Sequence, residues 1–192
     1  MGREFELKFA ADEAAQAAIA ARFDGFETIT MQTTYYDMPD GRLSARHVTL
    51  RRRIENGRSV CALKTPSGSL CRGEWETECD RIEDAVPILC KLSDWELLPI
   101  LERSGVIPIC GARFTRRACT LSLGECTVEI ALDQGILTGG HRELPLCEVE
   151  VELKSGSETA AMDFANELAQ TYGLTQEYKS KFRRALALAK GE

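Results

Sequence analysis

Strict alternation of charged and apolar side chains marks the segment CEVEVELK, residues 147–154. Successive side chains of a β-strand point to opposite faces, so Glu148, Glu150 and Glu152 share one face and the apolar residues share the other. Three carboxylates about 7 Å apart in a row repel one another unless a cation lies between them. One such strand also fits an ordinary half-solvated sheet, so the interpretation depends on the rest of the chain.

A second row of this kind lies at the start of the chain, in the segment EFELKF, residues 4–9. Glu4, Glu6 and Lys8 share one face of this strand, and its apolar side chains share the other. Later alternating segments carry the opposite sign, at Arg51, Arg53, Lys64, Arg72 and Arg116. Acidic and basic rows within one sheet predict a cavity lined by charged side chains.

Alternating segments and turn residues predict an antiparallel sheet through the middle of the chain. The expected strands cover residues 47–55, 60–65, 72–79, 114–123, 126–133 and 146–154. Helices are expected over residues 12–23, 157–172 and 176–190, with two more within 84–104. If the charged faces point inward, amphipathic helices can cover the apolar outer faces. We therefore expect an α+β fold, with one domain over residues 1–192 built as an inside-out β-barrel.

The composition excludes several classes of protein. The chain has 192 residues and a formal net charge of −6, which argues against general affinity for nucleic acids or anionic membranes. No apolar run approaches the roughly 20 residues of a membrane span, and the sequence opens without a signal peptide, so we expect a cytoplasmic protein. Its 8 cysteines form no CxxC pair and only 2 histidines are present, so zinc-finger spacing is missing.

The charged rows suit two kinds of ligand. Carboxylates bind hard divalent cations through oxygen, whereas Arg and Lys bind phosphate oxygens. A ligand that needs both together is a metal-bound polyphosphate. No serine, cysteine or histidine stands out as a nucleophile, which fits a reaction that needs none.

A series of short motifs extends in order along the whole chain. They are EFELK (residues 4–8), TYYDMP (34–39), LRRR (50–53), LKT (63–65), RGE (72–74), Arg116, EIALD (129–133), EVEVE (148–152) and SK (180–181). The set resembles the motifs of the CYTH superfamily, the triphosphate tunnel metalloenzymes, and looks most like its bacterial inorganic triphosphatases. The resemblance implies a closed tunnel of eight antiparallel strands, with helices outside and a C-terminal helix, that binds a triphosphate group inside.

The resemblance also implies a role for each charged position. The phosphate-binding cations would be Arg51, Arg53, Lys64, Arg72, Arg116 and Lys181. The metal ligands would be Glu4, Glu6, Asp133, Glu148, Glu150 and Glu152, with Glu74 and Glu129 as further candidates. The residues expected to act in catalysis are Glu4, Glu6, Lys8, Glu150 and Lys181. Arg52 has the opposite strand parity from its neighbours and is expected to face away from the tunnel.

We therefore expect metal-dependent hydrolysis of inorganic triphosphate to diphosphate and phosphate, with two Mg²⁺ or Mn²⁺ ions per active site. The partner is then a small-molecule triphosphate, with no nucleic acid and no membrane, bound by a monomer or a homodimer. The same residues also suit thiamine triphosphate, another organic triphosphate or the class IV adenylyl cyclase reaction on ATP. A non-catalytic polyphosphate-binding module is the alternative of another class, although binding phosphate alone requires cations and no acidic rows.

Overall fold

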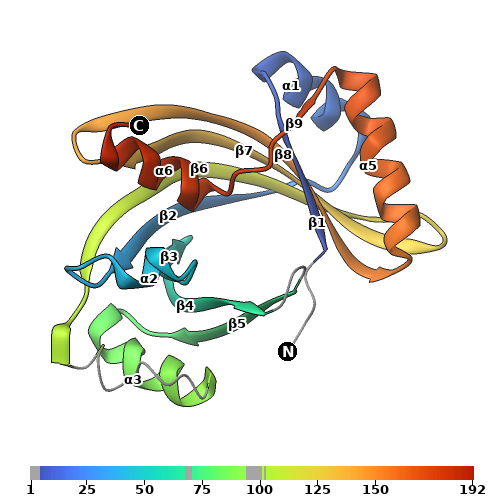
Figure 1. Cartoon of the computed structure of the whole chain (residues 1–192). Helices are drawn as coiled ribbons and strands as arrows, with labels where there is room; N and C mark the ends of the chain where they lie inside the picture. Colours follow the sequence, from blue (N-terminus) through green and yellow to red (C-terminus); the bar gives the residue numbers. More distant parts are fainter. Residues whose placement is uncertain (1–4, 68–70, 94–100, 102) are drawn as a thin grey trace.

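The computed structural model describes residues 5–67, 71–93, 101 and 103–192. Within them, nine strands and five helices have defined bounds (Figure 1). In chain order the elements are β1 (Glu6–Ala10), α1 (Glu13–Arg22), β2 (Glu27–Asp37), α2 (Arg42–Ala45), β3 (Thr49–Glu55), β4 (Arg58–Ser67), β5 (Cys71–Glu78), α3 (Ile82–Ser93), β6 (Ile107–Ser122), β7 (Cys126–Gly139), β8 (Arg142–Gly156), α5 (Glu158–Tyr172), β9 (Thr175–Gln176) and α6 (Lys181–Lys190).

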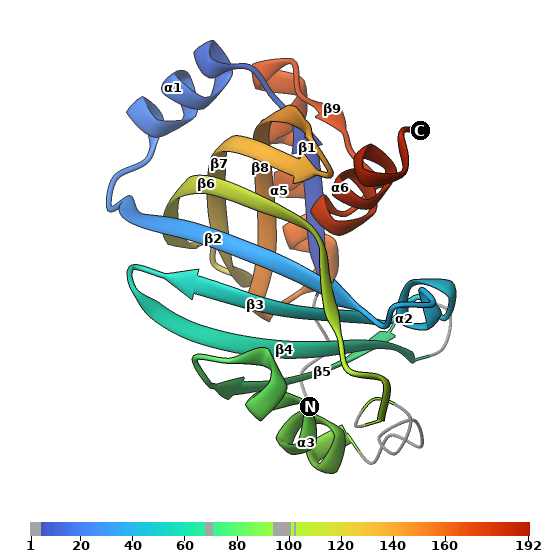
Figure 2. The same cartoon turned by 90° about the vertical axis from the view of Figure 1, so that its left-hand side faces the viewer.

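All nine strands belong to one antiparallel sheet in the order β5-β4-β3-β2-β6-β7-β8-β1-β9. Strands β1 to β8 match the expected number, and the two-residue β9 extends the sheet beyond β1. The sheet is strongly curved, so that its two ends turn toward each other (Figures 1 and 2). The expected closure into a barrel is not found among the described residues, because no hydrogen-bonded pairing there joins β5 to β1 or β9.

The expected elements are largely present, with several different bounds. The strand β2 was expected only as a motif, because its sequence ETITMQTTYYD alternates weakly in polarity. The last helix begins at Lys181, later than expected, because Thr175 and Gln176 pair with β1 and the Ser180 side chain accepts a hydrogen bond from Arg183 N. Of the two helices expected within 84–104, one is α3 and the other falls mainly on residues outside the described part.

Two groups of helices cover the outer, apolar face of the sheet (Figure 1). Helices α1 and α5 pack on β7, β8 and β1 through a core that includes Ile19, Val149 and Ala165. Helix α3 packs on β4 and β5, through a core that includes Leu63 and Leu89. None of the helices in the described ranges is long and apolar enough to span a bilayer.

Helix α6 lies on the opposite, inner face, against β6, β7 and β8 (Figure 2). The buried core on this side contains Met31, Tyr35, Phe114, Leu137, Leu146 and Ala185. The approach of α6 requires a glycine at position 139, since a Cβ there would lie 2.5 Å from the carbonyl oxygen of Ala185 and 2.5 Å from the nitrogen of Ala189. Arg142 donates a hydrogen bond of 3.2 Å to the carbonyl of Leu188, near the C-terminal end of the helix. These contacts hold α6 so that its first turn reaches the charged side chains of the inner face.

Candidate functional site

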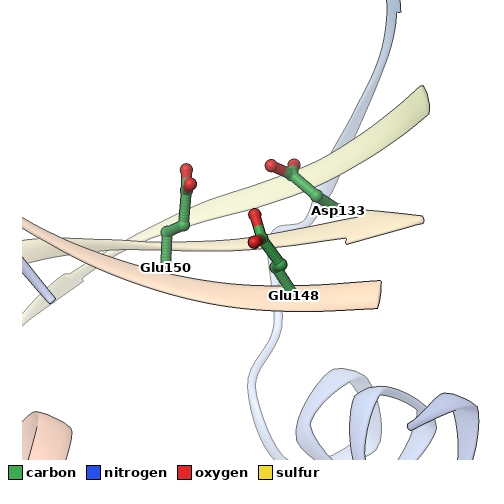
Figure 3. Close-up of side chains that lie close together, drawn as sticks. All are labelled: Asp133, Glu148 and Glu150. Carbon is green, nitrogen blue, oxygen red and sulfur yellow. The ribbon is translucent and has the colours of Figure 1, made fainter. Parts of the chain in front are cut away.

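Three buried carboxylates point toward one another on the inner face of the sheet (Figure 3). Asp133 of β7 lies directly opposite Glu148 of β8, and Glu150 follows two residues later on the same face. One oxygen from each carboxylate lies within 4.8 Å of the others. The exposed fraction is 0% for Asp133 and Glu148 and 7% for Glu150. We call these three residues the acidic cluster.

Three cations compensate the acidic cluster. The Nζ atom of Lys181 lies 2.5 to 2.8 Å from one oxygen of each of its carboxylates. Arg116 of β6 donates two hydrogen bonds of 2.8 Å to Asp133 and also pairs with Glu150. Arg184 of α6 pairs with Glu148. Each carboxylate of the acidic cluster therefore has at least one cationic partner.

The cations keep Glu150 ionised despite its burial. Burial favours the neutral form of Glu150, but Lys181 and Arg116 outweigh it and lower the pKa of this carboxyl to about 2. Burial likewise opposes the charge of Lys181, yet the surrounding carboxylates raise its pKa above the ordinary value. Burial also opposes the charge of Arg116, but Asp133 and Glu150 outweigh it and raise the pKa of this guanidinium. At neutral pH Glu150, Lys181 and Arg116 therefore form a charged network.

Other members of the two acidic rows surround this cluster. Lys8 of β1 lies directly opposite Glu150 in the strand register, and its charge helps to lower the pKa of that carboxyl. Glu6 lies opposite Glu152. The Glu152 carboxylate is 27% exposed and pairs with the Nζ atom of Lys154 at 2.9 Å. The row of residues 148–152 is thus divided between a buried cluster and a more exposed ion pair.

A row of cations lies on the same face of β3 and β4. Arg51 and Arg53 project from β3 and Lys64 from β4, and we call these residues the basic row. Arg51 Nη2 and Lys64 Nζ lie 3.2 and 3.0 Å from the same oxygen of Glu74, and Arg53 pairs with Glu55 at 2.9 Å. The Nε atoms of both arginines are buried and have no hydrogen-bond partner. Because a buried unpaired donor is costly, these two atoms indicate a place for the oxygens of an anion.

Tyr35 connects the basic row with α6. Its ring packs against the ring of Phe182, with 5.0 Å between the centroids. Burial raises the pKa of the Tyr35 hydroxyl, and the charges of Arg51, Arg53 and Lys181 partly offset this effect. Tyr35 also lies directly opposite Arg51 in the strand register, and Phe182 directly follows Lys181 in α6, so one buried side chain adjoins both groups. The basic row and Lys181, which pairs with the acidic cluster, therefore face the same region on the inner side of the sheet.

The remaining expected site residues lie elsewhere or outside the described residues. Glu4 lies outside them, as does the side chain of Arg72. Glu129, a further candidate metal ligand, has a carboxylate oxygen 3.4 Å from Lys154 Nζ. Arg52 points to the opposite face, as its parity predicts, and donates a hydrogen bond of 3.0 Å to a serine of β4.

Arg184 belongs to the site but was not singled out from the sequence. It is 14% exposed and lies three residues after Lys181, so both side chains project from the same face of α6. The neighbouring Arg183 is exposed. Helical spacing from Lys181 is the signal that distinguishes the two arginines, once Lys181 is known to point inward.

The sequence of the chain matches a known family. Residues 2–186 match the CYTH domain, and the chain belongs to this family. The inorganic triphosphatase of Haemophilus influenzae is 30% identical over 166 residues, which cover 84% of this chain and 47% of that protein. The chain therefore spans about half the length of this curated relative.

Solved structures with the same architecture support the fold. A proposed adenylyl cyclase from Hippeastrum, with a dominant triphosphatase activity, superposes with a TM-score of 0.70 at 17% identity and covers 100% of this chain and 97% of its own. A protein from Pyrococcus horikoshii superposes with a TM-score of 0.66 at 24% identity, covering 97% of this chain and 99% of its own. At these identities the likeness shows a shared fold.

The acidic cluster has the composition of a site for a hard divalent cation. It offers three carboxylates with oxygens within 4.8 Å of one another, and oxygen ligands of this kind suit Mg²⁺ or Mn²⁺. The Oε2 atom of Glu148 is buried and accepts no hydrogen bond, although it lies 2.6 Å from Lys181 Nζ as an ion pair. Since Lys181 stands among the same oxygens, its ammonium group and a divalent cation would compete for them.

Replacement of Glu150 by Gln should destabilise the protein in the absence of divalent metal. At pH about 7 we expect the free energy of unfolding to fall by about 3 kcal/mol, because Arg116 and Lys181 lose a buried partner. Since the folded pKa of Glu150 is lowered from 4.5 to about 2, this contribution is present above pH 4.5 and is lost as the pH falls toward 2. Urea denaturation at pH about 7 and about 3 measures it.

The matched control is Glu143→Gln, which removes the exposed partner of Arg113. Exposed ion pairs contribute little, so we expect a change below about 1 kcal/mol. A Glu150→Gln effect that is absent at pH about 7, or equally large at pH about 3, would contradict the charge network described above.

Proposed function

We propose that this CYTH domain hydrolyses inorganic triphosphate to diphosphate and phosphate, with Mg²⁺ or Mn²⁺ bound at the acidic cluster. One observation supports the proposal above all: the acidic cluster and the basic row face the same region, and the basic row has two buried Nε atoms without a partner. A polyanion that carries a divalent cation matches both groups at once.

The basic row would bind the phosphate oxygens and neutralise their charge. Its strands fix Arg51, Arg53 and Lys64 in place, so little reorganisation is needed when charge moves during the reaction. In the hydrolysis, a water oxygen bonds to the terminal phosphorus while the bond to the leaving diphosphate breaks, and negative charge accumulates on the leaving oxygen. Fixed cations stabilise that charge more than the charge of the bound substrate.

The acidic cluster would hold the divalent cation, whose charge neutralises and polarises phosphate oxygens when it is bound. Asp133, Glu148 and Glu150 are suited to this role because their oxygens converge, and because Lys181 and Arg116 lower the pKa of Glu150. If the cation displaced it from these oxygens, the ammonium group of Lys181 would become available to the substrate. This exchange reconciles its position among carboxylates with the phosphate-binding role expected from the sequence. The two ions expected per site remain a prediction.

The choice of substrate rests on the curated relative. That Haemophilus protein is named an inorganic triphosphatase and shares 30% identity with this chain over 166 residues, which cover 84% of this chain. We propose a small-molecule triphosphate as the partner, and we propose inorganic triphosphate over thiamine triphosphate and ATP on this ground.

We also propose that the strands β1 to β8 form the wall of a closed tunnel around the substrate. The curvature of the sheet supports this, since its two ends turn toward each other (Figure 2). The charged inner face gives a physical reason for enclosure, because removal of water strengthens the electrostatic interactions between the side chains and the phosphate.

The test is release of phosphate from inorganic triphosphate, thiamine triphosphate and ATP, measured side by side with Mg²⁺, with Mn²⁺ and with EDTA. We expect metal-dependent release, abolished by EDTA and fastest by about tenfold or more for inorganic triphosphate. Pyrophosphate formed from ATP would indicate a cyclase instead. Binding of triphosphate with Mg²⁺ but no turnover would indicate a non-catalytic polyphosphate-binding module.

The basic row is tested by Arg53→Met, with Arg52→Met as the control on the opposite face of the same strand. We expect Arg53→Met to lower kcat/KM for inorganic triphosphate by about 100-fold or more, since it removes a fixed cation from the inner face. Arg52→Met should change kcat/KM by less than about threefold, because Arg52 bonds to a serine of β4 on the other face. Equal effects of the two substitutions would rule out a specific role for the basic row.

A further inference from the structure

The side chain of Gln16 lies behind the acidic cluster, on the outer face of the sheet. Gln16 belongs to α1 and is only 1% exposed. Its Nε2 atom donates a hydrogen bond of 3.0 Å to the backbone carbonyl of Asp133 and one of 2.8 Å to the backbone carbonyl of Glu148. One side-chain amide therefore ties together the backbones of two residues of the acidic cluster.

These two carbonyls belong to residues that lie directly opposite each other on β7 and β8. The carboxylates of Asp133 and Glu148 project to the inner face (Figure 3), whereas Gln16 belongs to α1, whose Ile19 packs in the core of the outer face. The amide thus contacts neither the carboxylates nor the region that a substrate would occupy. It can act on the cluster only by fixing the spacing and orientation of the strands that carry it.

Helix α1 provides a firm support for this amide. Asp12 caps its first turn by accepting a hydrogen bond of 2.8 Å from Ala15 N. Ile19, one turn after Gln16 on the same face, is 0% exposed in the outer core. Gln16 and Ile19 are the two buried residues of α1, and only Gln16 is polar. A buried polar side chain costs free energy unless its hydrogen bonds are satisfied, and the Nε2 atom of this amide has two carbonyl partners.

From this geometry we propose that Gln16 is a positioning residue for the divalent cation, acting through the backbones of Asp133 and Glu148. Carboxylates that repel one another tend to move apart, and a cation site requires them within a narrow range of spacing. The clamp on the two carbonyls opposes that movement from behind. The inference deepens the proposed function, on which it rests in one respect: the acidic cluster must hold the cation.

The experiment measures binding of Mn²⁺ alone, without triphosphate, to the full chain. The variant is Gln16→Met, which keeps the volume of the side chain but removes both hydrogen-bond donors. Electron paramagnetic resonance counts the free Mn²⁺ and calorimetry confirms the dissociation constant. We expect binding to weaken by about tenfold, as is usual for the loss of a group that orients metal ligands. Saturating Mn²⁺ should restore the bound signal.

The matched control is Gln134→Met. Gln134 also joins β7 to α1, but its side-chain hydrogen bond of 2.8 Å runs from Nε2 to the Glu13 carboxylate and not to a backbone carbonyl of the acidic cluster. Mn²⁺ affinity should remain within about twofold of the wild type in this variant, and thermal melts of both variants without metal measure any general loss of stability. If Gln16→Met does not fold, Gln16→Asn replaces it, because the shorter amide cannot reach both carbonyls.

Wild-type affinity for Mn²⁺ in a folded Gln16 variant overturns the inference, and so does an equal loss in the Gln134 control. Absence of Mn²⁺ binding to the wild type also overturns it, since there would be no site to position. If the wild type binds Mn²⁺ but releases no phosphate from triphosphate, the proposed function fails. The positioning role of Gln16 is then judged only from the Mn²⁺ affinities of the wild type, the Gln16 variant and the Gln134 control.

Discussion

Three carboxylates lie within 4.8 Å of one another in a part of the protein that water scarcely reaches. At an effective dielectric constant of about 20, two like charges about 4 Å apart repel by about 4 kcal/mol. The charged carboxylates can therefore lie this close in the folded protein only if cations lie beside them. Arg116 supplies one from the adjacent strand, and Lys181 and Arg184 bring two more from α6. The position of the C-terminal helix inside the curved sheet follows from this requirement and from the apolar contacts behind it.

The two halves of the inner face are prepared for different ligands. Each carboxylate of the acidic cluster already pairs with at least one cation, so a divalent cation must replace charges that are already present. In the basic row, two buried Nε atoms lack a partner, so an anion would satisfy donors that the protein leaves unpaired. Both halves depend on the alternation of strand side chains, which sends apolar residues outward under the helices and charged residues inward.

The alternation within single strands could be predicted from the sequence, and it fixed the inner face of β1, β3 and β8 and the outward direction of Arg52. Contacts between distant elements could not be predicted. The alternation along a strand shows to which face a side chain points, but it does not show which residue the side chain contacts. Glu152 has the parity of Glu148 and Glu150 but pairs with Lys154. Arg183 and Arg184 are both arginines of α6, and they differ only in the direction in which the side chain projects from the helix. The carbonyl contacts of Gln16 depend on where α1 packs, and no local pattern indicates that.

The most direct test of this account is the Mn²⁺ affinity of Lys181→Met in the absence of triphosphate, with the exposed Lys190→Met of the same helix as the control. The ammonium group of Lys181 lies 2.5 to 2.8 Å from oxygens of all three carboxylates, where it would compete with a divalent cation. We predict that Lys181→Met binds Mn²⁺ more tightly, by about tenfold, and that the control is unchanged. Unchanged or weaker binding by Lys181→Met would contradict the claim that the lysine and the metal share one site.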